Sequence, residues 1–388
     1  MTAQVATPIE WSVSSGVPLL RSVASAIVKL AGISQPGDPV YPSVVQRAYD
    51  QLVLACLTRG AEPPNSVPAM AEWARSRPVR EWPVDLPGDA AAPDEFLVDA
   101  STLAPTQACM EWALPQPDPT AEQFEQLLIN EAFATCRAAS SPHAYTAFRR
   151  LLIEKPVLTR AEAAALAGDS TLLLLHETIM KSYPAAPAAY QREGRFVQCA
   201  RCRCLMVPVR DGRYRCELDR CKRDGIARPG QVLGARDGGG VLQLARPLRM
   251  FITGPGLAEI ELEAALRKLG LDPEMWPQYD AYDLRVLLPG GTAWAVDVKD
   301  RANPALLSRQ TRLFPPDPPF ARAFLVVPRY RFTDREDYHR VFAANLPAGL
   351  KGQIELCSDE QFLKQVRRAL RADRRSGQPT AQGRPADA

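Results

Sequence analysis

The stretch YDAYDLRVLLPGGTAWAVDVKDRANPALLSRQ, residues 279–310, decides the fold of the C-terminal part of the chain. Two apolar segments with strand character, residues 283–288 and 292–298, flank a Pro-Gly-Gly turn. Apolar runs of this length that are bounded by turn residues are typical of paired β-strands. The sequence therefore predicts a hairpin, followed by a helix that begins at Pro304.

Three charged side chains of this hairpin are expected on one face. If the hairpin is symmetric about Gly290, Asp283 lies opposite Asp297, with Cβ atoms about 5 Å apart, and the two carboxylates could share one divalent cation. Lys299 follows Asp297 by two residues and points to the same face. Metal-assisted phosphodiester hydrolysis needs such a set, with Mg²⁺ or Mn²⁺ on the acids and the lysine beside the developing charge. The alternative is a solvent-exposed hairpin with charges at its strand ends.

The region from about residue 250 to 330 resembles the PD-(D/E)xK superfamily, the fold of many restriction endonucleases. A helix ending in Leu-Gly, an Asp before an apolar strand, a Gly-rich turn, a strand into Asp297-Val-Lys299 and a further helix follow in the family's order. The strand ARAFLVVPR then completes an α-β-β-β-α-β core. The resemblance implies an α/β restriction-endonuclease-like core in which Asp283 and Asp297 bind Mg²⁺ and Lys299 is catalytic.

The resemblance also implies an acidic residue in the first helix of this core. Glu259 stands about ten positions before Leu269 and Gly270, where the family often places it, and Glu263 is the alternative. In the helix after the second strand, Arg309 and Gln310 occupy positions where relatives often have a polar side chain.

A cysteine cluster precedes this core, in CARCRCLMVPVRDGRYRCELDRC, residues 199–221. Cys199 and Cys202 form a C-x2-C pair, and Cys216 and Cys221 form a C-x4-C pair beyond an Asp-Gly turn. Two such pairs on facing turns supply the four soft ligands that Zn²⁺ prefers, so the spacing predicts a structural zinc ribbon. An Fe-S cluster and free thiols are the alternatives. Cys204 is a fifth thiol that could replace Cys202.

The ribbon is also the most basic part of the sequence, as contact with a DNA backbone requires. A basic surface without a ligand is the alternative. The residues concerned are Arg201, Arg203, Arg210, Arg213, Arg215, Arg220, Lys222 and Arg223.

Helices are expected through the N-terminal part of the chain, because residues 17–33, 42–60 and 120–139 have apolar side chains spaced near 3.6 residues. Gly32 and Gly60 stand where helix C-caps are expected. The Pro-rich and Ala-rich segment 78–119 predicts an irregular connection.

Residues 145–190 follow the order of a helix-turn-helix or winged-helix module. Thr159 would cap its second helix, and the recognition helix would begin near Ser170 or Thr171. The stretch TLLLLHETIM is too apolar to enter a DNA groove, so helical packing is the favoured role of this module.

These parts define a multidomain protein. The narrower resemblance, carried by the domain order and the ribbon, is to the restriction-endonuclease-like proteins of prokaryotic PIWI-type (pPIWI-RE) defence systems. It implies a role against phage or plasmids and N-terminal docking to partner proteins of the same system. The expected divisions are an α-helical region 1–144, the helix-turn-helix or winged-helix part 145–190, a four-cysteine zinc ribbon 191–246, a nuclease core 247–372 and a disordered tail 373–388.

Composition places the expected activity inside the cell. No apolar run approaches the roughly 18 residues of a membrane span, and the N-terminal residues do not form a signal peptide. Nine cysteines without an export signal favour metal binding and reduced thiols, so a cytoplasmic protein is expected. The net charge of +3 is too small to indicate a nucleic-acid partner by itself.

The leading hypothesis is a Mg²⁺-dependent DNA endonuclease with Asp283, Asp297, Lys299 and Glu259 in its site. The alternative is an inactive nucleic-acid-binding or scaffold subunit that keeps the nuclease fold. An RNA substrate is not distinguished, because phosphodiester chemistry alone does not report the 2′-hydroxyl. A homodimer or a partner nuclease is expected if both strands are cut.

Overall fold

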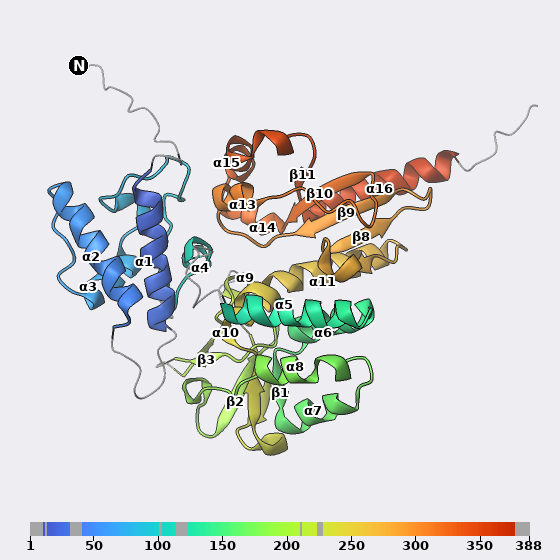
Figure 1. The fold of residues 1–388 in the computed structure, drawn as a ribbon, viewed down its shortest axis with the longest axis horizontal. Helices are drawn as coiled ribbons and strands as arrows, with labels where there is room; N and C mark the ends of the chain where they lie inside the picture. The colour runs from blue at the N-terminus through green and yellow to red at the C-terminus, as the bar shows by residue number, and fades with distance from the viewer. Residues whose placement is uncertain are drawn as a thin grey trace, which may run out of the picture. The chain divides into compact units, whose positions relative to one another are not determined.

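The computed structural model describes residue 11 and residues 14–31, 41–100, 103–113, 123–209, 212–222 and 228–376 (Figure 1). The chain packs as two compact units. The first contains the chain up to Gly254 together with residues 301–311 and 335–347, and the second contains residues 255–300, 312–334 and 348 onward. The chain therefore leaves the second unit twice to complete the first.

The N-terminal helices form where apolar periodicity predicts them. They are α1 (Gly16–Ala31), α2 (Ser43–Thr58) and α3 (Val67–Ser76), and they bury one apolar stripe each in a common core. Gly60 has φ +66° and follows the end of α2, as expected of a C-cap glycine. Gly32 lies outside the described residues.

The segment 78–119 is more ordered than its composition predicts. It contains a short 3-10 turn η1 (Val79–Glu81) and the helix α4 (Gln107–Ala113), whereas residues 114–119 lie outside the described part. Cys109 and Trp112 of α4 are fully buried in the core of the N-terminal helices. The prediction of an irregular connection was wrong for α4, because a seven-residue helix is too short to show a clear periodicity.

Two helices from the C-terminal part of the sequence complete the first unit. They are α13 (Pro304–Gln310) and α15 (Tyr338–Asn345), which pack on each other, and Leu306 of α13 joins the N-terminal core. The buried carboxylate of Glu111 in α4 accepts hydrogen bonds from the backbone N–H of Ala302 at 2.8 Å and of Asn303 at 2.9 Å. Glu111 thus holds the N-terminal end of α13.

A small strand-and-helix module follows the N-terminal helices in the first unit. It contains α5 (Gln123–Ala138), α6 (Pro142–Glu154), β1 (Val157–Thr159), α7 (Arg160–Ala165), η2 (Leu166–Gly168), η3 (Leu173–Leu175), α8 (His176–Ser182) and η4 (Ala188–Tyr190). It ends with η5 (Asp237–Gly239), β6 (Val241–Gln243), α10 (Arg246–Leu248) and the π-helical turn η6 (Arg249–Thr253). Thr159 caps α7 through a capping box with Glu162, as predicted.

β6 is the central strand of this module. β1 pairs antiparallel with β6, and Ala185 bridges Leu242 on the other side of β6. The ribbon lies between Ala185 and β6 in the chain. The helix after α7 begins at His176 and not near Ser170 or Thr171, because the Asp169 carboxylate accepts the N–H of Thr171 and forms a local turn first. Leu173 and Leu174 of η3 and Met180 of α8 are exposed.

The second unit is built on a mixed five-stranded sheet of order β11-β10-β9-β8-β7. Its helices are α11 (Gly254–Lys268), α12 (Pro277–Asp280), α14 (Arg329–Asp334), the 3-10 turn η7 (Ala348–Leu350) and α16 (Asp359–Ser376). Its strands are β7 (Glu274–Met275), β8 (Leu284–Leu287), β9 (Ala293–Val298), β10 (Arg322–Val327) and β11 (Glu355–Ser358). β7, β8 and β9 are antiparallel neighbours, whereas β9, β10 and β11 are parallel.

The order α11-β7-β8-β9-α13-β10 is the α-β-β-β-α-β order that the sequence predicts. α13, however, packs in the first unit. α16 continues to Ser376 and so includes the first four residues of the segment 373–388 that was expected to be disordered; the rest of that segment lies outside the described residues. Across the described part of the chain, the helices are all too short or too polar to cross a lipid bilayer.

The contribution of the Glu111 carboxylate to the stability of the fold can be tested by mutation. Changing Glu111→Gln keeps the size of the side chain but removes the charge and turns an amide N–H₂ toward one of two buried backbone donors. We expect the free energy of unfolding to fall by about 1.5–3 kcal/mol, the value of a hydrogen bond to a charged group. Urea denaturation measures it. Glu81→Gln, at an exposed position of η1, is the matched control and should stay within about 0.5 kcal/mol of the parent protein. Equal losses in both variants would contradict the role of Glu111.

Candidate functional site

The β8–β9 hairpin has the register that the sequence predicts. Leu284 pairs with Val296, and the turn closes with Leu288 N–H donating to Thr292 O at 2.9 Å. Continuing the register by one residue puts Asp283 opposite Asp297. Asp283 is 3% exposed, so its carboxylate is held inside the unit.

Lys299 joins the two carboxylates. Its Nζ lies 2.7 Å from Asp297 Oδ1 and 3.5 Å from Asp283 Oδ2, and the side chain of Lys299 is 33% exposed. The Asp283 carboxylate is also held by the backbone of β9, since its Oδ2 accepts the N–H of Val298 at 2.6 Å. The acids and the lysine are thus oriented by one another and by the strand backbone, with the Lys299 side chain partly exposed.

Glu259 belongs to the same group of side chains through a tryptophan. Trp276, 1% exposed, donates its indole N–H to Glu259 Oε2 at 2.6 Å and its backbone N–H to Asp283 O at 2.8 Å. Glu263, the alternative helix carboxylate, forms an ion pair with Arg267 at 3.0 Å. The geometry therefore favours Glu259 over Glu263 as the acid beside Asp283.

The sequence interpretation did not include Trp276. Its backbone has φ +47°, and Gln278, Tyr279 and Asp280 also have positive φ. Non-glycine residues in this region are strained, and such strain concentrates at functional sites. The signal in the sequence was a tryptophan directly before a proline and a predicted strand Asp, which is weak without the contact to α11.

The electrostatics of the group follow from burial and from like charge. Burial raises the pKa of Asp283 well above its usual range, and the nearby carboxylates of Glu259 and Asp297 raise it further, against the opposing effect of Lys299. Burial alone would lower the pKa of Lys299, but Asp283 and Asp297 raise it, so the side chain stays an ammonium. A cation is therefore favoured between the carboxylates of Asp283 and Asp297.

The residues present fit a hydrated divalent cation. Mg²⁺ is usually bound by one or two carboxylates and keeps several waters, and Asp283 and Asp297 supply two. Glu259 does not close a three-carboxylate set, because within the described residues the only three or more metal-type ligand atoms within 4.8 Å of one another belong to cysteines. Arg309, at the expected polar position of α13, instead lies over the ring of Trp11 in the first unit.

The second candidate site is the ribbon. Its strands are β2 (Arg195–Cys199), β3 (Val207–Pro208), β4 (Tyr214–Arg215) and β5 (Pro229–Gly234), with the helical turn α9 (Asp219–Lys222). β3 and β4 form the predicted hairpin, in which Gly212 has φ +83°. Asp211 of the predicted turn lies outside the described residues.

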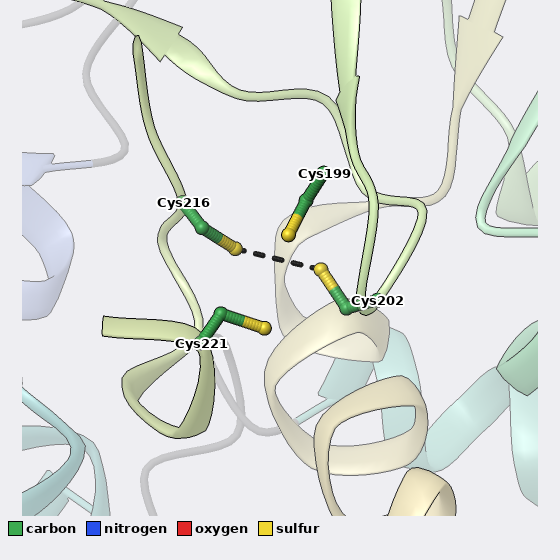
Figure 2. A group of neighbouring side chains, drawn as sticks. All are labelled: Cys199, Cys202, Cys216 and Cys221. Carbon is green, nitrogen blue, oxygen red and sulfur yellow. Dashed lines mark hydrogen bonds between the residues drawn. The ribbon is translucent and has the colours of Figure 1, made fainter. Parts of the chain in front are cut away.

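The four predicted cysteines converge. Figure 2 shows the sulfurs of Cys199, Cys202, Cys216 and Cys221 turned toward one another, all within 4.8 Å and all buried. Cys202 Sγ and Cys216 Sγ lie 3.4 Å apart, close to the edge of about 3.8 Å that a tetrahedron with Zn–S bonds of about 2.3 Å requires. Cys202 and not Cys204 is in the group. The set fits Zn²⁺.

Hydrogen bonding among these thiols favours a single thiolate. Cys202, and then Cys216 and Cys221, donate to Cys199, which lowers the pKa of Cys199. The same contact with Cys199 raises the pKa of Cys202 and of Cys216. A bound Zn²⁺ would let all four ionise, which couples metal binding to folding of the ribbon.

Several arginines of the ribbon are used to hold it in place. Arg201 donates to the carbonyl of Arg220, Arg203 to that of Glu154 at 3.0 Å, and Arg220 to that of Gly254. Buried Arg249 pairs with Glu217 at 2.6 Å. The basic composition of this region is therefore in part structural, while Arg210 and Arg223 lie outside the described residues and the side chain of Lys222 is not described.

Zinc content distinguishes the ligands. We expect the parent protein and Cys204→Ser to retain about one zinc per chain, and Cys202→Ser and Cys216→Ser to lose it, because a structural zinc needs all four of its ligands. Inductively coupled plasma mass spectrometry on dialysed protein measures it. Both types of variant remove one buried thiol of the same segment, so retention in Cys202→Ser with loss in Cys204→Ser would reverse the assignment.

Two family models match this chain, one in its N-terminal part and one in its C-terminal part. The family model described as pPIWI_RE three-gene island domain Y matches residues 19–159, and the model described as REase associating with pPIWI_RE matches residues 256–374. No curated protein and no solved structure matches the chain. The two family matches confirm the resemblance seen in the sequence. Residues 19–159 therefore match the domain Y of pPIWI_RE three-gene islands, and residues 256–374 match the REase that associates with pPIWI_RE.

Proposed function

We propose that the second unit is a divalent-metal-dependent endonuclease of PD-(D/E)xK type that hydrolyses DNA phosphodiester bonds in a prokaryotic defence system. The family match supports a nuclease-like role in a pPIWI-RE island. One observation carries the finer proposal: Lys299 Nζ bridges Asp297 and Asp283, which the hairpin register places opposite each other.

Each residue then has a distinct role. Asp283 and Asp297 hold Mg²⁺ or Mn²⁺, which supplies polarisation of the phosphate and a more acidic water. Lys299, charged and partly exposed, stabilises negative charge on the phosphate. Glu259 accepts the indole N–H of Trp276 and adds negative charge beside Asp283, which strengthens the preference of the site for a cation.

The remaining parts position this chemistry. In the proposal the zinc ribbon contacts the DNA backbone through those cations that are not bonded inside the protein, and the N-terminal unit docks to other proteins of the island, with which the domain Y match associates the chain. A second active site, from another copy or a partner nuclease, would be needed for a double-strand cut. We expect the activity in the cytoplasm.

An inactive DNA-binding subunit is the second candidate function. The observation that favours it is the strong burial of Asp283, whose raised pKa opposes the ionised form that a metal ligand needs. The two functions differ in cleavage and not in binding, so a cleavage assay separates them.

Cleavage of supercoiled plasmid tests the nuclease. We expect nicking or linearisation with Mg²⁺ or Mn²⁺, its loss in Asp297→Asn, and a fall of about 10²–10³-fold in Lys299→Met, the cost of removing one charge-stabilising donor. Asp272→Asn, in which the removed charge is 90% exposed in a loop of the same unit, should cut like the parent protein. Far-ultraviolet circular dichroism checks that each variant folds.

Metal dependence is better tested by omitting Mg²⁺ and Mn²⁺ than by adding EDTA, because a chelator would also remove zinc from the ribbon. Cleavage by Asp297→Asn as fast as by the parent protein would show that the site is elsewhere. If the parent protein cuts no DNA with either metal, even with the other proteins of its island present, the inactive-subunit function replaces the nuclease.

A further inference from the structure

The last helix of the second unit carries a basic stripe. α16 (Asp359–Ser376) packs against β10 and β11 and buries Phe362 and Val366 fully. The side chains of Lys364, Arg367, Arg368 and Arg371 are exposed. Their spacing of three, four and seven residues puts them on one face of the helix, opposite the buried face.

Among the residues that the structure describes, no ion pair joins an acidic side chain to this stripe. The acids in the first turn of α16 are engaged elsewhere: Asp359 accepts the backbone N–H of Arg329 at 2.9 Å, and Glu360 pairs with the guanidinium of Arg329 at 2.6 Å. Residues 361–372 contain no acid at all. Like charges at this spacing destabilise a helix, so the helix keeps an unfavourable arrangement without a compensating ion pair.

The helix dipole does not account for the stripe. Cations are favoured at a helix C-terminus only within about the last turn. Lys364 and Arg367 stand more than two turns before Ser376, the last residue of α16. The other basic region of the chain differs, because Arg201, Arg203 and Arg220 of the ribbon donate to backbone carbonyls.

We infer that the basic stripe of α16 binds the phosphate backbone of a nucleic acid without reading its sequence. From Lys364 to Arg371 the stripe extends about 10 Å at 1.5 Å per residue, a length over which a DNA duplex carries about six phosphates. Phosphates of both strands then face four free cations. This inference rests on the proposed function for its choice of partner: a nuclease needs the nucleic acid, whereas an acidic protein would satisfy the charge alone.

The stripe is separate from the carboxylates of the hairpin. Because β9, β10 and β11 are parallel, α16 starts at the sheet edge that carries Lys299 and then runs back along the strands. The guanidinium of Arg322, the first residue of β10, donates to Gln365 Oε1 at 2.9 Å. The stripe would therefore lengthen the contact with nucleic acid and would not enter the chemical step.

The salt dependence of binding tests the stripe. The full chain with Asp297→Asn and no added Mg²⁺ is titrated onto fluorescein-labelled duplex DNA, single-stranded DNA and single-stranded RNA over a series of KCl concentrations. In the variant in which Lys364, Arg367, Arg368 and Arg371 are all changed to Gln, we expect the slope of log Kobs against log salt to fall by about 3 to 4 for duplex, and by about 3 for single strands.

A variant of equal charge is the control. Changing Arg59, Arg75, Arg150 and Arg340 to Gln also removes four positive charges, but each of these arginines is already paired with an acid of this chain. We expect its slope to stay within about one of the parent value. Circular dichroism and zinc content verify that both variants fold.

Two results would overturn the inference. An equal loss of slope in both variants would show that the salt dependence reflects net charge and not the stripe. An unchanged slope in the stripe variant would exclude nucleic acid as the partner of the stripe and would make an acidic protein the partner class. Since binding is measured in an inactive background, loss of binding in a protein that never cleaves plasmid would support the stripe while contradicting the proposed nuclease. The duplex, single-strand and RNA arms identify which nucleic acid supplies the phosphates.

Discussion

The antiparallel register of β8 and β9 is the constraint on which the second unit depends. A shift by one residue would send Asp283 to the face opposite Asp297 and Lys299, and so would separate it from both. The register is held by the Leu288–Thr292 turn and by the Val298 N–H that bonds Asp283. The strained backbone at Trp276 then brings the indole to Glu259. The charged group thus exists only because neighbouring backbone contacts enforce it.

The ribbon shows a second use of local geometry. Its four sulfurs converge because each cysteine pair stands at a tight turn, and the ribbon as a whole lies between Ala185 and β6 in the chain. Three arginines of the ribbon donate to backbone carbonyls. These three guanidinium groups therefore help to hold the ribbon in place, whereas the exposed cations Lys364, Arg367, Arg368 and Arg371 of α16 have no such bond in the described part of the chain.

The packing units do not coincide with the family matches. The REase match covers residues 256–374, yet residues 301–311 and 335–347 within it pack in the first unit. α13 is fixed there by Glu111 and by Asn303, whose amide donates to Ala90 O at 2.7 Å. The first unit therefore combines residues of the domain Y region and of the REase region, and separating them would expose Leu306 of α13, which packs in the N-terminal core.

The sequence by itself determined the features that depend on short spacing: the hairpin and its register, the two cysteine pairs, the capping box at Thr159 and the N-terminal helices. Local periodicity and turn residues fix these, because all the atoms involved lie within a few residues of one another. Tertiary structure decided what depends on distant partners. It selected Cys202 over Cys204 and favoured Glu259 over Glu263 through Trp276. It also placed Glu111 under a helix about 190 residues away, and it left Lys364, Arg367, Arg368 and Arg371 exposed. Such choices arise from long-range packing and hydrogen bonding, for which a single sequence carries no periodic signal.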